Sequence, residues 1–168
     1  ESCERKKEND FFMVRLTSTS KANVWIRSFV IFKCGIIIII DDYNLDDNLP
    51  VENKIILDQS YTVTLFSSNT YKILRNKKMC VSNLHFKIFC KQKIDEIVSV
   101  ENERITTGLY STTVSSSIVR KALGKEFTQF AVFCLPDACS NFLFFDFGLK
   151  VFQEGREYLI TNIEVKSS

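Results

Sequence analysis

The chain has 168 residues, of which 45% are hydrophobic, so it can bury the core of one substantial domain or of two small ones. Two prolines and five glycines exclude a collagen-like or Pro-rich chain, and the run Ile36–Ile40 is too short to span a bilayer. The formal net charge is +2, but residues 1–94 carry 15 Lys and Arg against 10 Asp and Glu, whereas residues 95–168 carry 7 against 10. We therefore expect a basic first half, an acidic second half and no membrane partner.

The first half is expected to be almost entirely β. In several short segments β-branched and aromatic residues alternate with polar ones, which is the period of a strand with one buried face. The predicted strands cover residues 11–17, 23–34, 35–41, 60–67 and 80–91. The polar stretches DDYNLDDNLP and SSNTYKILRNKK are interpreted as long connections between them.

The segment VWIRSFVIFKCG, residues 24–35, raises the question of what its second face contacts. Successive side chains of a strand point to opposite sides, so an inward set of Val, Ile and Phe leaves Trp25, Arg27, Phe29 and Lys33 pointing outward. A surface on which rings alternate with cations is unusual for a solvated face. It indicates a binding surface or a second core.

A basic segment follows, because residues 71–94 contain seven Lys and Arg and no acidic residue. Within it, NLHFKIFCKQK repeats the alternation, with Leu84 inward and His85, Lys87 and Phe89 outward. Cations that follow a phosphate backbone, interleaved with rings that stack on bases, are typical of a groove for single-stranded nucleic acid. The alternative is that the second half of the chain covers the rings and leaves the lysines at the rim.

Fewer secondary-structure elements are predicted in the second half of the chain. Residues 95–112 are interpreted as a partly extended connector, and SSSIVRKALGKEF predicts a short helix with Val119 and Leu123 on one face and Gly124 at its end. FTQFAVFCL, NFLFFDFG and REYLITNIEVKS predict three strands. Three strands do not close a barrel, so the unit over residues 113–168 is incomplete or uses strands of the connector.

The six cysteines leave two alternatives open. They suit three disulfides in a secreted domain, but the inward or strand-end positions of Cys34 and Cys90 favour free thiols in an intracellular protein. A disulfide between Cys134 and Cys139 is expected in an oxidising compartment. The same pair with Cys80 and Cys90 has the wrong spacings for a zinc ribbon.

Catalytic chemistry is not expected. His85 is the single histidine, which excludes a multi-histidine metal site, and its basic neighbours indicate a surface position. The five glycines are too dispersed for a phosphate-binding loop. The acid pairs Asp41-Asp42 and Asp46-Asp47 lack the spaced ligands of a calcium loop. We therefore expect no enzyme, no metal and no cofactor.

The final stretch FFDFGLKVFQEGREYLITNIEVKSS resembles oligonucleotide/oligosaccharide-binding (OB) barrels of the replication protein A, protection-of-telomeres and breast-cancer-2 type. In those proteins an aromatic–acid–aromatic strand precedes a strand of the form EGxxYxIxN. The matching residues here are Glu154, Gly155, Tyr158, Ile160 and Asn162. The first half resembles the same design, with Tyr61 in the place of that tyrosine, and SSIVRKALG is similar to the short helix that leads a barrel in telomere-end proteins.

The resemblance implies a mainly β chain with the OB-fold, a small Greek-key β-barrel, in two tandem copies with a short helix between them. Residues 1–94 would form the first barrel with its basic groove, residues 95–112 the connector, and residues 113–168 the second OB-like unit. Such a chain is expected to serve in genome maintenance in the nucleus. Its acidic second half would hold a protein partner.

The resemblance also implies that single-stranded DNA lies across one face of the first barrel. Arg75, Lys77 and Lys78 would contact phosphates, while Trp25 and Phe29 would stack on bases. The expected nucleic-acid-binding residues are Trp25, Arg27, Phe29, Lys33, Tyr71, Lys72, Arg75, Lys77, Lys78, His85, Lys87, Phe89 and Lys91.

Two alternatives to nucleic-acid binding remain, and in both the chain binds another protein. The chain could be a secreted, disulfide-bonded β-sandwich or netrin-like domain that binds another protein, or an OB barrel that serves only as a protein-interaction scaffold. A count of free thiols separates the secreted form from the intracellular one.

Overall fold

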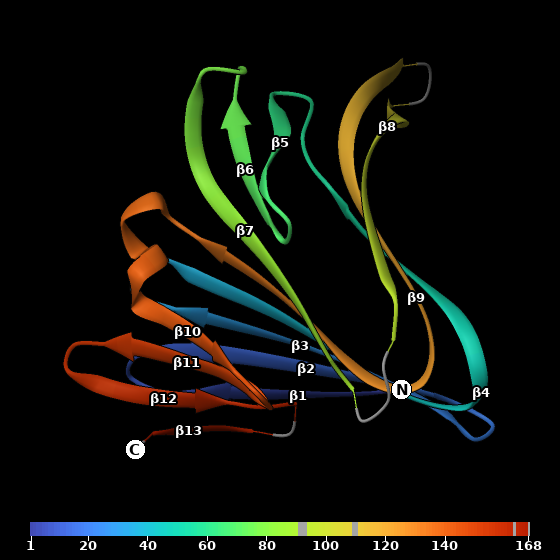
Figure 1. The fold of residues 1–168 in the computed structure, drawn as a ribbon, viewed down its shortest axis with the longest axis vertical. Helices are drawn as coiled ribbons and strands as arrows, with labels where there is room; N and C mark the ends of the chain where they lie inside the picture. The colour runs from blue at the N-terminus through green and yellow to red at the C-terminus, as the bar shows by residue number, and fades with distance from the viewer. Residues whose placement is uncertain (91–93, 109–110, 163, 168) are drawn as a thin grey trace.

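In a computed structural model the chain folds into two antiparallel β-sheets (Figure 1). The structure describes the chain except for residues 91–93, 109–110, 163 and 168, and except for the side chains of residues 106–111. The expectation of a mainly β chain is confirmed. In the part that is described, no helix has the length and hydropathy needed to cross a bilayer.

The larger sheet has the strand order β1-β2-β3-β4-β9-β7-β6-β5, with β8 paired to β9. Its strands are β1 (Ser2–Lys7), β2 (Phe11–Ser20), β3 (Asn23–Phe32), β4 (Ile36–Ile56), β5 (Tyr61–Ser67), β6 (Thr70–Arg75), β7 (Met79–Cys90), β8 (Glu96–Gly108) and β9 (Ser111–Cys134). Strands β1 and β5 lie at opposite ends of this order, so the described strands form an open sheet and do not close into a barrel.

Two long strands bend the sheet over one of its own faces. The first part of β4 pairs with the second part of β9, and the register shifts between Asn44 and Leu49 before β4 continues along the first part of β9. Both strands curve strongly in Figure 1. We call β8, residues 49–56 of β4 and residues 111–124 of β9 the folded arm. The arm buries Ile118 with Tyr71 and other residues of β6 and β7.

The two faces of the larger sheet are defined by residues that lie directly opposite each other on paired strands, whose side chains share a face. Face A carries the paired residues Phe29, Ile39, Ala131 and Phe86, and the folded arm covers part of it. Face B carries the paired residues Val30, Ile38, Val132 and His85. Each face contributes to a separate hydrophobic core.

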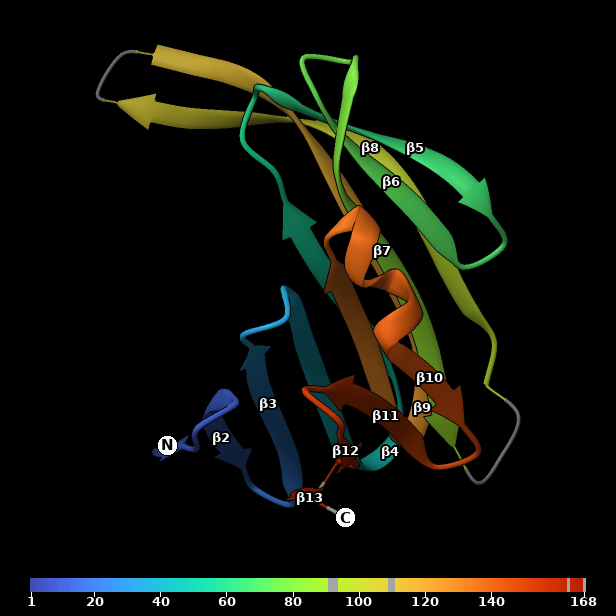
Figure 2. The same ribbon diagram turned by 90° about the vertical axis from the view of Figure 1, so that its left-hand side faces the viewer.

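The smaller sheet packs on face B and makes the molecule a β-sandwich. Its strands are β10 (Phe142–Phe145), β11 (Gly148–Gln153), β12 (Arg156–Ile160) and β13 (Val165–Ser167), and the 3₁₀ helix η1 (Pro136–Asn141) joins β9 to β10. Figure 2 shows these strands against the larger sheet. Leu149, Val151 and Ile160 are fully buried there with Val30 and Val132. This is the largest core of the molecule.

Several sequence-based predictions are corrected by this arrangement. The helix expected in SSSIVRKALGKEF is wrong, because the segment lies in β9 and pairs with β4 and β8. Val119 is buried while Leu123 is 59% exposed, so the two do not share a buried helical face. Of the stretches interpreted as connections, DDYNLDDNLP lies within β4 across its register shift, and SSNTYKILRNKK contains β6. The expected boundaries at residues 94 and 112 lie within one sheet, since β9 pairs with β7 and β4.

Asp10 connects the start of β2 to the smaller sheet. Its carboxylate accepts hydrogen bonds from the Tyr158 hydroxyl and from Arg156 Nη1, the latter at 3.2 Å. The hydrogen bond from Tyr158 is the main cause that lowers the pKa of Asp10 below its ordinary value of 3.8, and Arg156 adds to it. The ionised carboxylate therefore stabilises the folded state above pH 3.8, and this contribution is lost as the pH falls through the lowered pKa.

We expect Asp10→Asn to make the protein less sensitive to acid. Wild type should exceed the variant in unfolding free energy at neutral pH, and the difference should shrink below pH 3.8 because only wild type then takes up the proton. Urea unfolding of both proteins across a pH series measures this difference. A difference that stays constant down to the lowest pH at which both remain folded would contradict the assignment.

Candidate functional site

The expected nucleic-acid-binding residues do not form one surface. Trp25, Arg27 and Phe29 lie on face A, because Phe29 pairs with Ile39. The second expected group, Lys87 and its neighbours on β7, lies on face B. A strand pattern repeated in two places therefore gives two surfaces on opposite sides of the sheet, and the expectation of one continuous groove is wrong.

Trp25 and Arg27 make polar and ring contacts with other residues of the chain. Arg27 Nε lies 2.6 Å from Asp41 Oδ1, and Trp25 Nε1 donates to the same oxygen at 3.1 Å. The guanidinium lies 5.0 Å from the Trp25 ring centroid, and the indole stacks on Tyr43 with the planes 7° apart. This contact set answers the question raised by the alternating rings and cations. The Arg27 charge is paired with a buried carboxylate.

The two rings of the second group pack against the smaller sheet, while Lys87 between them is exposed. The ring of Phe89 lies 5.2 Å from Phe130 and 6.5 Å from Phe144, and His85 makes an edge contact with Phe142. Burial lowers the pKa of His85 below its usual value. The expectation of free outward rings at His85 and Phe89 is wrong, because both rings are half-buried and pack against the smaller sheet.

The remaining expected residues are scattered. Tyr71 is 5% exposed and packs edge-on against Phe86, so its ring is part of a core. Lys72 lies over the Phe66 ring at 4.0 Å, and Lys33 is exposed after β3. Lys91 lies outside the described residues.

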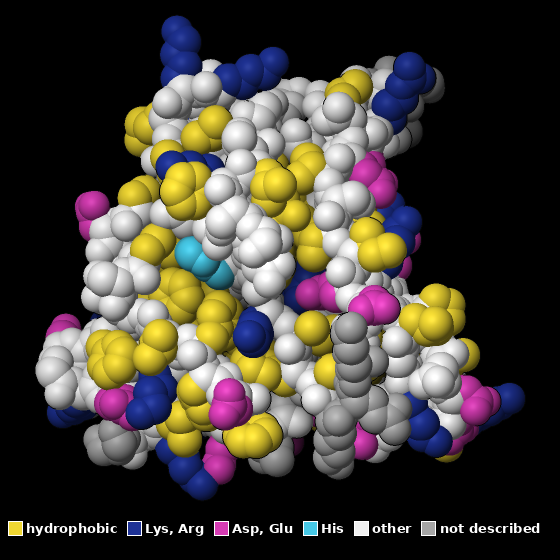
Figure 3. Space-filling model, viewed as in Figure 1, with side chains coloured by type: hydrophobic (Ala, Val, Ile, Leu, Met, Phe, Trp, Pro, Cys, Tyr) yellow, Lys and Arg dark blue, Asp and Glu magenta, His cyan; other side chains and the backbone are white. Residues whose placement is uncertain are grey.

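A basic turn between β6 and β7 keeps its cations exposed. We use this name for Arg75, Lys77 and Lys78, and no ion pair joins any of the three to a described residue. Asn76 and Lys77 have φ values of 48° and 60°, which places both in the left-handed region of a tight turn. Figure 3 shows Lys and Arg side chains projecting at this end of the molecule. The turn thus groups three of the predicted cations where an anion can reach them together.

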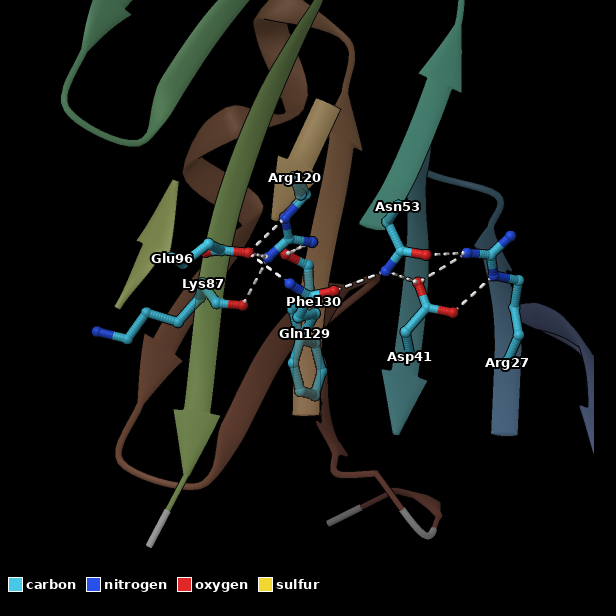
Figure 4. Close-up of polar contacts among 8 residues, drawn as sticks. All are labelled: Arg27, Asp41, Asn53, Lys87, Glu96, Arg120, Gln129 and Phe130. Atoms are coloured by element: carbon cyan, nitrogen blue, oxygen red, sulfur yellow. Dashed lines mark hydrogen bonds and ion pairs between the residues drawn. The ribbon is translucent and has the colours of Figure 1, made fainter. Parts of the chain in front are cut away.

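A buried polar network was missed by the sequence analysis (Figure 4). Arg120, on the folded arm, lies 2.6 Å from Glu96 and donates to the backbone oxygen of Phe130 at 3.2 Å. The network continues from Glu96 through Gln129 at 2.7 Å to Asn53 at 2.6 Å. Burial lowers the pKa of Arg120, and the Glu96 carboxylate opposes that shift.

This network joins the folded arm to the main part of the sheet. Asn53 receives a 2.9 Å hydrogen bond from Arg27, which in turn is paired with Asp41, so the chain of contacts runs across face A from β3 to β8. Its groups come from strands that lie far apart in sequence. The only sequence signal was the presence of charged and amide residues inside otherwise apolar strands.

A third feature lies where β7, the end of β9 and η1 meet. Cys134 and Cys139 form a disulfide, as expected for an oxidising compartment, while Cys3, Cys34, Cys80 and Cys90 are free. The ligand atoms of His85, Cys134 and Cys139 lie within 4.8 Å of one another. The four-cysteine combination with Cys80 and Cys90 does not come together among the described residues. The spacing of residues in the sequence could not predict this histidine as a neighbour of the two cysteines, because it comes from a different strand, β7.

An open cavity of about 370 Å³ lies where the ends of β7 and of the paired parts of β4 and β9 meet the turn between β10 and β11. Phe89, Phe127 and the exposed Phe147 line it together with the carboxylates of Asp42 and Asp146. Its aromatic and acidic lining disfavours a polyanion.

Comparison with known proteins gives a likeness at the level of the fold. No family model and no curated protein sequence matches the chain. Among solved structures it is similar to the heparan sulfate lyase HepC from Pedobacter heparinus (10% identity, TM-score 0.62), to a heparinase III (10%, 0.64) and to a heparinase III gene product (12%, 0.60). The matches cover 99% of this chain but only 26–27% of those chains, so this chain spans about a quarter of their length.

Proposed function

We propose that the chain is a β-sandwich module that binds an anionic polysaccharide. The observation that carries this proposal is the likeness of 99% of the chain to a segment of three lyase structures, whose names refer to heparin or heparan sulfate, with TM-scores of 0.60–0.64. A module of such a protein can serve in binding without cleaving a bond. The expectation that this chain has no catalytic activity of its own stays a prediction.

The basic turn is the proposed contact surface. Arg75, Lys77 and Lys78 are exposed, and none has an ion pair with a described residue, so sulfate or carboxylate groups can reach them without displacing a protein carboxylate. The acidic cavity beside the turn between β10 and β11 is unsuitable for the same polymer. Charge therefore favours the turn over the cavity.

Single-stranded DNA, bound by OB barrels, remains the runner-up. The same three cations would contact phosphates, but base stacking needs free rings. Tyr71 is buried, and Trp25 is stacked on Tyr43. The open strand order of the larger sheet also does not support an OB barrel.

The nuclear location and the protein partner of the acidic half stay predictions. The Cys134–Cys139 disulfide fits the secreted alternative, although four cysteines are free.

The test is a titration of labelled heparin oligosaccharide, followed by fluorescence anisotropy at several salt concentrations. We expect the triple variant Arg75→Ser, Lys77→Asn and Lys78→Ser to bind about 10- to 30-fold more weakly, since three exposed ion pairs are worth roughly 0.5–0.7 kcal/mol each. The salt slope should fall by about one unit per cation lost. Asparagine suits the left-handed conformation of Lys77, so the turn should be retained.

The matched control removes three cations that are already paired. Lys121, Lys150 and Lys166 each have a Glu partner, and replacing all three by Gln changes the net charge equally. The control variant should bind like wild type within a few-fold. Equal losses in both variants would mean that only net charge matters, and no heparin binding at low salt would reject the proposal. Tighter binding of oligo-dT at matched charge would favour the nucleic-acid alternative.

A further inference from the structure

The His85 imidazole has one ring nitrogen without a partner. Its Nδ1 lies 3.2 Å from Thr70 Oγ1, whereas Nε2 is buried and makes no hydrogen bond to a described residue. A buried nitrogen without a hydrogen bond destabilises the folded state, so an unpaired Nε2 needs a physical reason. If Nδ1 carries the proton and donates it to Thr70, then Nε2 presents a lone pair, which is the form of imidazole that binds a metal ion.

Two sulfur atoms lie close to the imidazole, within 4.8 Å of one of its ring nitrogens. Cys134 is fully buried at the end of β9, Cys139 is half-buried on η1, and both sulfurs fall with the His85 ligand atom in a group no wider than 4.8 Å. Ligand atoms of a tetrahedral zinc ion are roughly 3.3–3.8 Å apart, given Zn–S and Zn–N bonds of about 2.3 and 2.0 Å. Small side-chain movements therefore separate this cluster from a zinc geometry.

The surroundings also suit thiolate ligands. Asn83 Nδ2 donates to Cys139 Sγ at 3.0 Å, and such a donor stabilises a thiolate. Asn83 and Cys134 are directly opposite each other on paired strands, and Ser82 Oγ donates to the Cys134 backbone oxygen at 3.1 Å. The Phe142 ring packs against His85 at 5.0 Å. Strand pairing and packing thus hold the cluster in place.

We propose that His85, Cys134 and Cys139 form a redox-gated site for Zn²⁺, closed in the disulfide form and opened by a thiol reductant. In the opening step two reductant thiols are oxidised to a disulfide, and their two electrons and two protons convert the Cys134–Cys139 bond to two thiols. Zn²⁺ then binds both sulfurs and His85 Nε2, and the two thiol protons pass to water. Soft sulfur and imidazole ligands favour zinc over magnesium or calcium, and water fills the fourth position.

The experiment uses the full chain with Cys3→Ser and Cys90→Ser, which removes the two exposed free thiols. Protein reduced with dithiothreitol is freed of reductant without oxygen and titrated with Zn²⁺ and, separately, with Co²⁺. We expect one equivalent of Zn²⁺ per reduced chain and none per oxidised chain. Co²⁺ should produce a thiolate charge-transfer band together with the intense visible bands of a tetrahedral site.

Two variants test the ligands. His85→Gln and Cys139→Ser should each weaken Zn²⁺ binding at least tenfold and change the cobalt spectrum, while Cys80→Ser should change neither. His85→Cys supplies a third thiolate and should restore binding, which keeps the test decisive if His85→Gln unfolds. Zinc binding that is equal in oxidised and reduced protein, or unchanged in both His85 variants and in Cys139→Ser, would overturn the proposal.

Discussion

Arg120→Met is expected to lower the free energy of unfolding by about 3–5 kcal/mol, because it removes one partner of a buried ion pair. The Arg120 side chain is 2% exposed and that of Glu96 is 10% exposed. The variant leaves the Glu96 carboxylate without its cation, and it leaves the backbone oxygen of Phe130 without the donor that Arg120 supplies at 3.2 Å. Urea unfolding followed by Trp25 fluorescence measures the loss.

A second substitution separates lost charge pairing from lost packing. Glu96→Gln keeps an oxygen that can accept from Gln129 but removes the buried charge. The double variant Arg120→Met with Glu96→Gln should therefore be more stable than Arg120→Met alone. Lys54→Met, which removes an exposed pair with Glu103, should have little effect. If the double variant is no more stable than the single one, the uncompensated charge is not the cause.

Phe130→Ala should cost about 3–5 kcal/mol for a different reason, since it opens a cavity in the core between the two sheets. Phe130 is 1% exposed on face B and makes an edge contact with Phe89 at 5.2 Å. The core that it joins also includes Leu149 and Val151 of the smaller sheet. The loss should appear both in thermal unfolding and in urea unfolding.

Phe147→Ala is the matched control, because Phe147 is 79% exposed in the turn between β10 and β11. This change should alter the unfolding free energy by no more than about 0.5 kcal/mol. A small loss of unfolding free energy for Phe130→Ala would mean that the smaller sheet does not pack closely on face B. Comparable losses for the two phenylalanines would contradict the burial described for both.

The alternation of side chains within single strands could be predicted from sequence. Val30 and Phe32 are buried and Ile31 is 43% exposed, as the period-two pattern of that segment requires. Leu84 and Phe86 are likewise buried. The prediction failed at β9, where SSSIVRKALGKEF suggested a helix, but Val119 and Arg120 are buried in a strand paired with both β4 and β8. Pairing with β4 and β8 outweighed the local helix signal.

The sequence by itself determined that the chain is mainly β, which side chains of β3 and β7 share a face within each strand, and that the basic residues near β6 are unaccompanied by acids. It could not relate one strand to another, because alternation has no information about register between strands. Only the tertiary structure placed Trp25 and His85 on opposite faces of the sheet. It also brought Arg120 to Glu96 and His85 to Cys134, since those contacts depend on the bend of β4 and β9 and on strand pairing over long sequence separations.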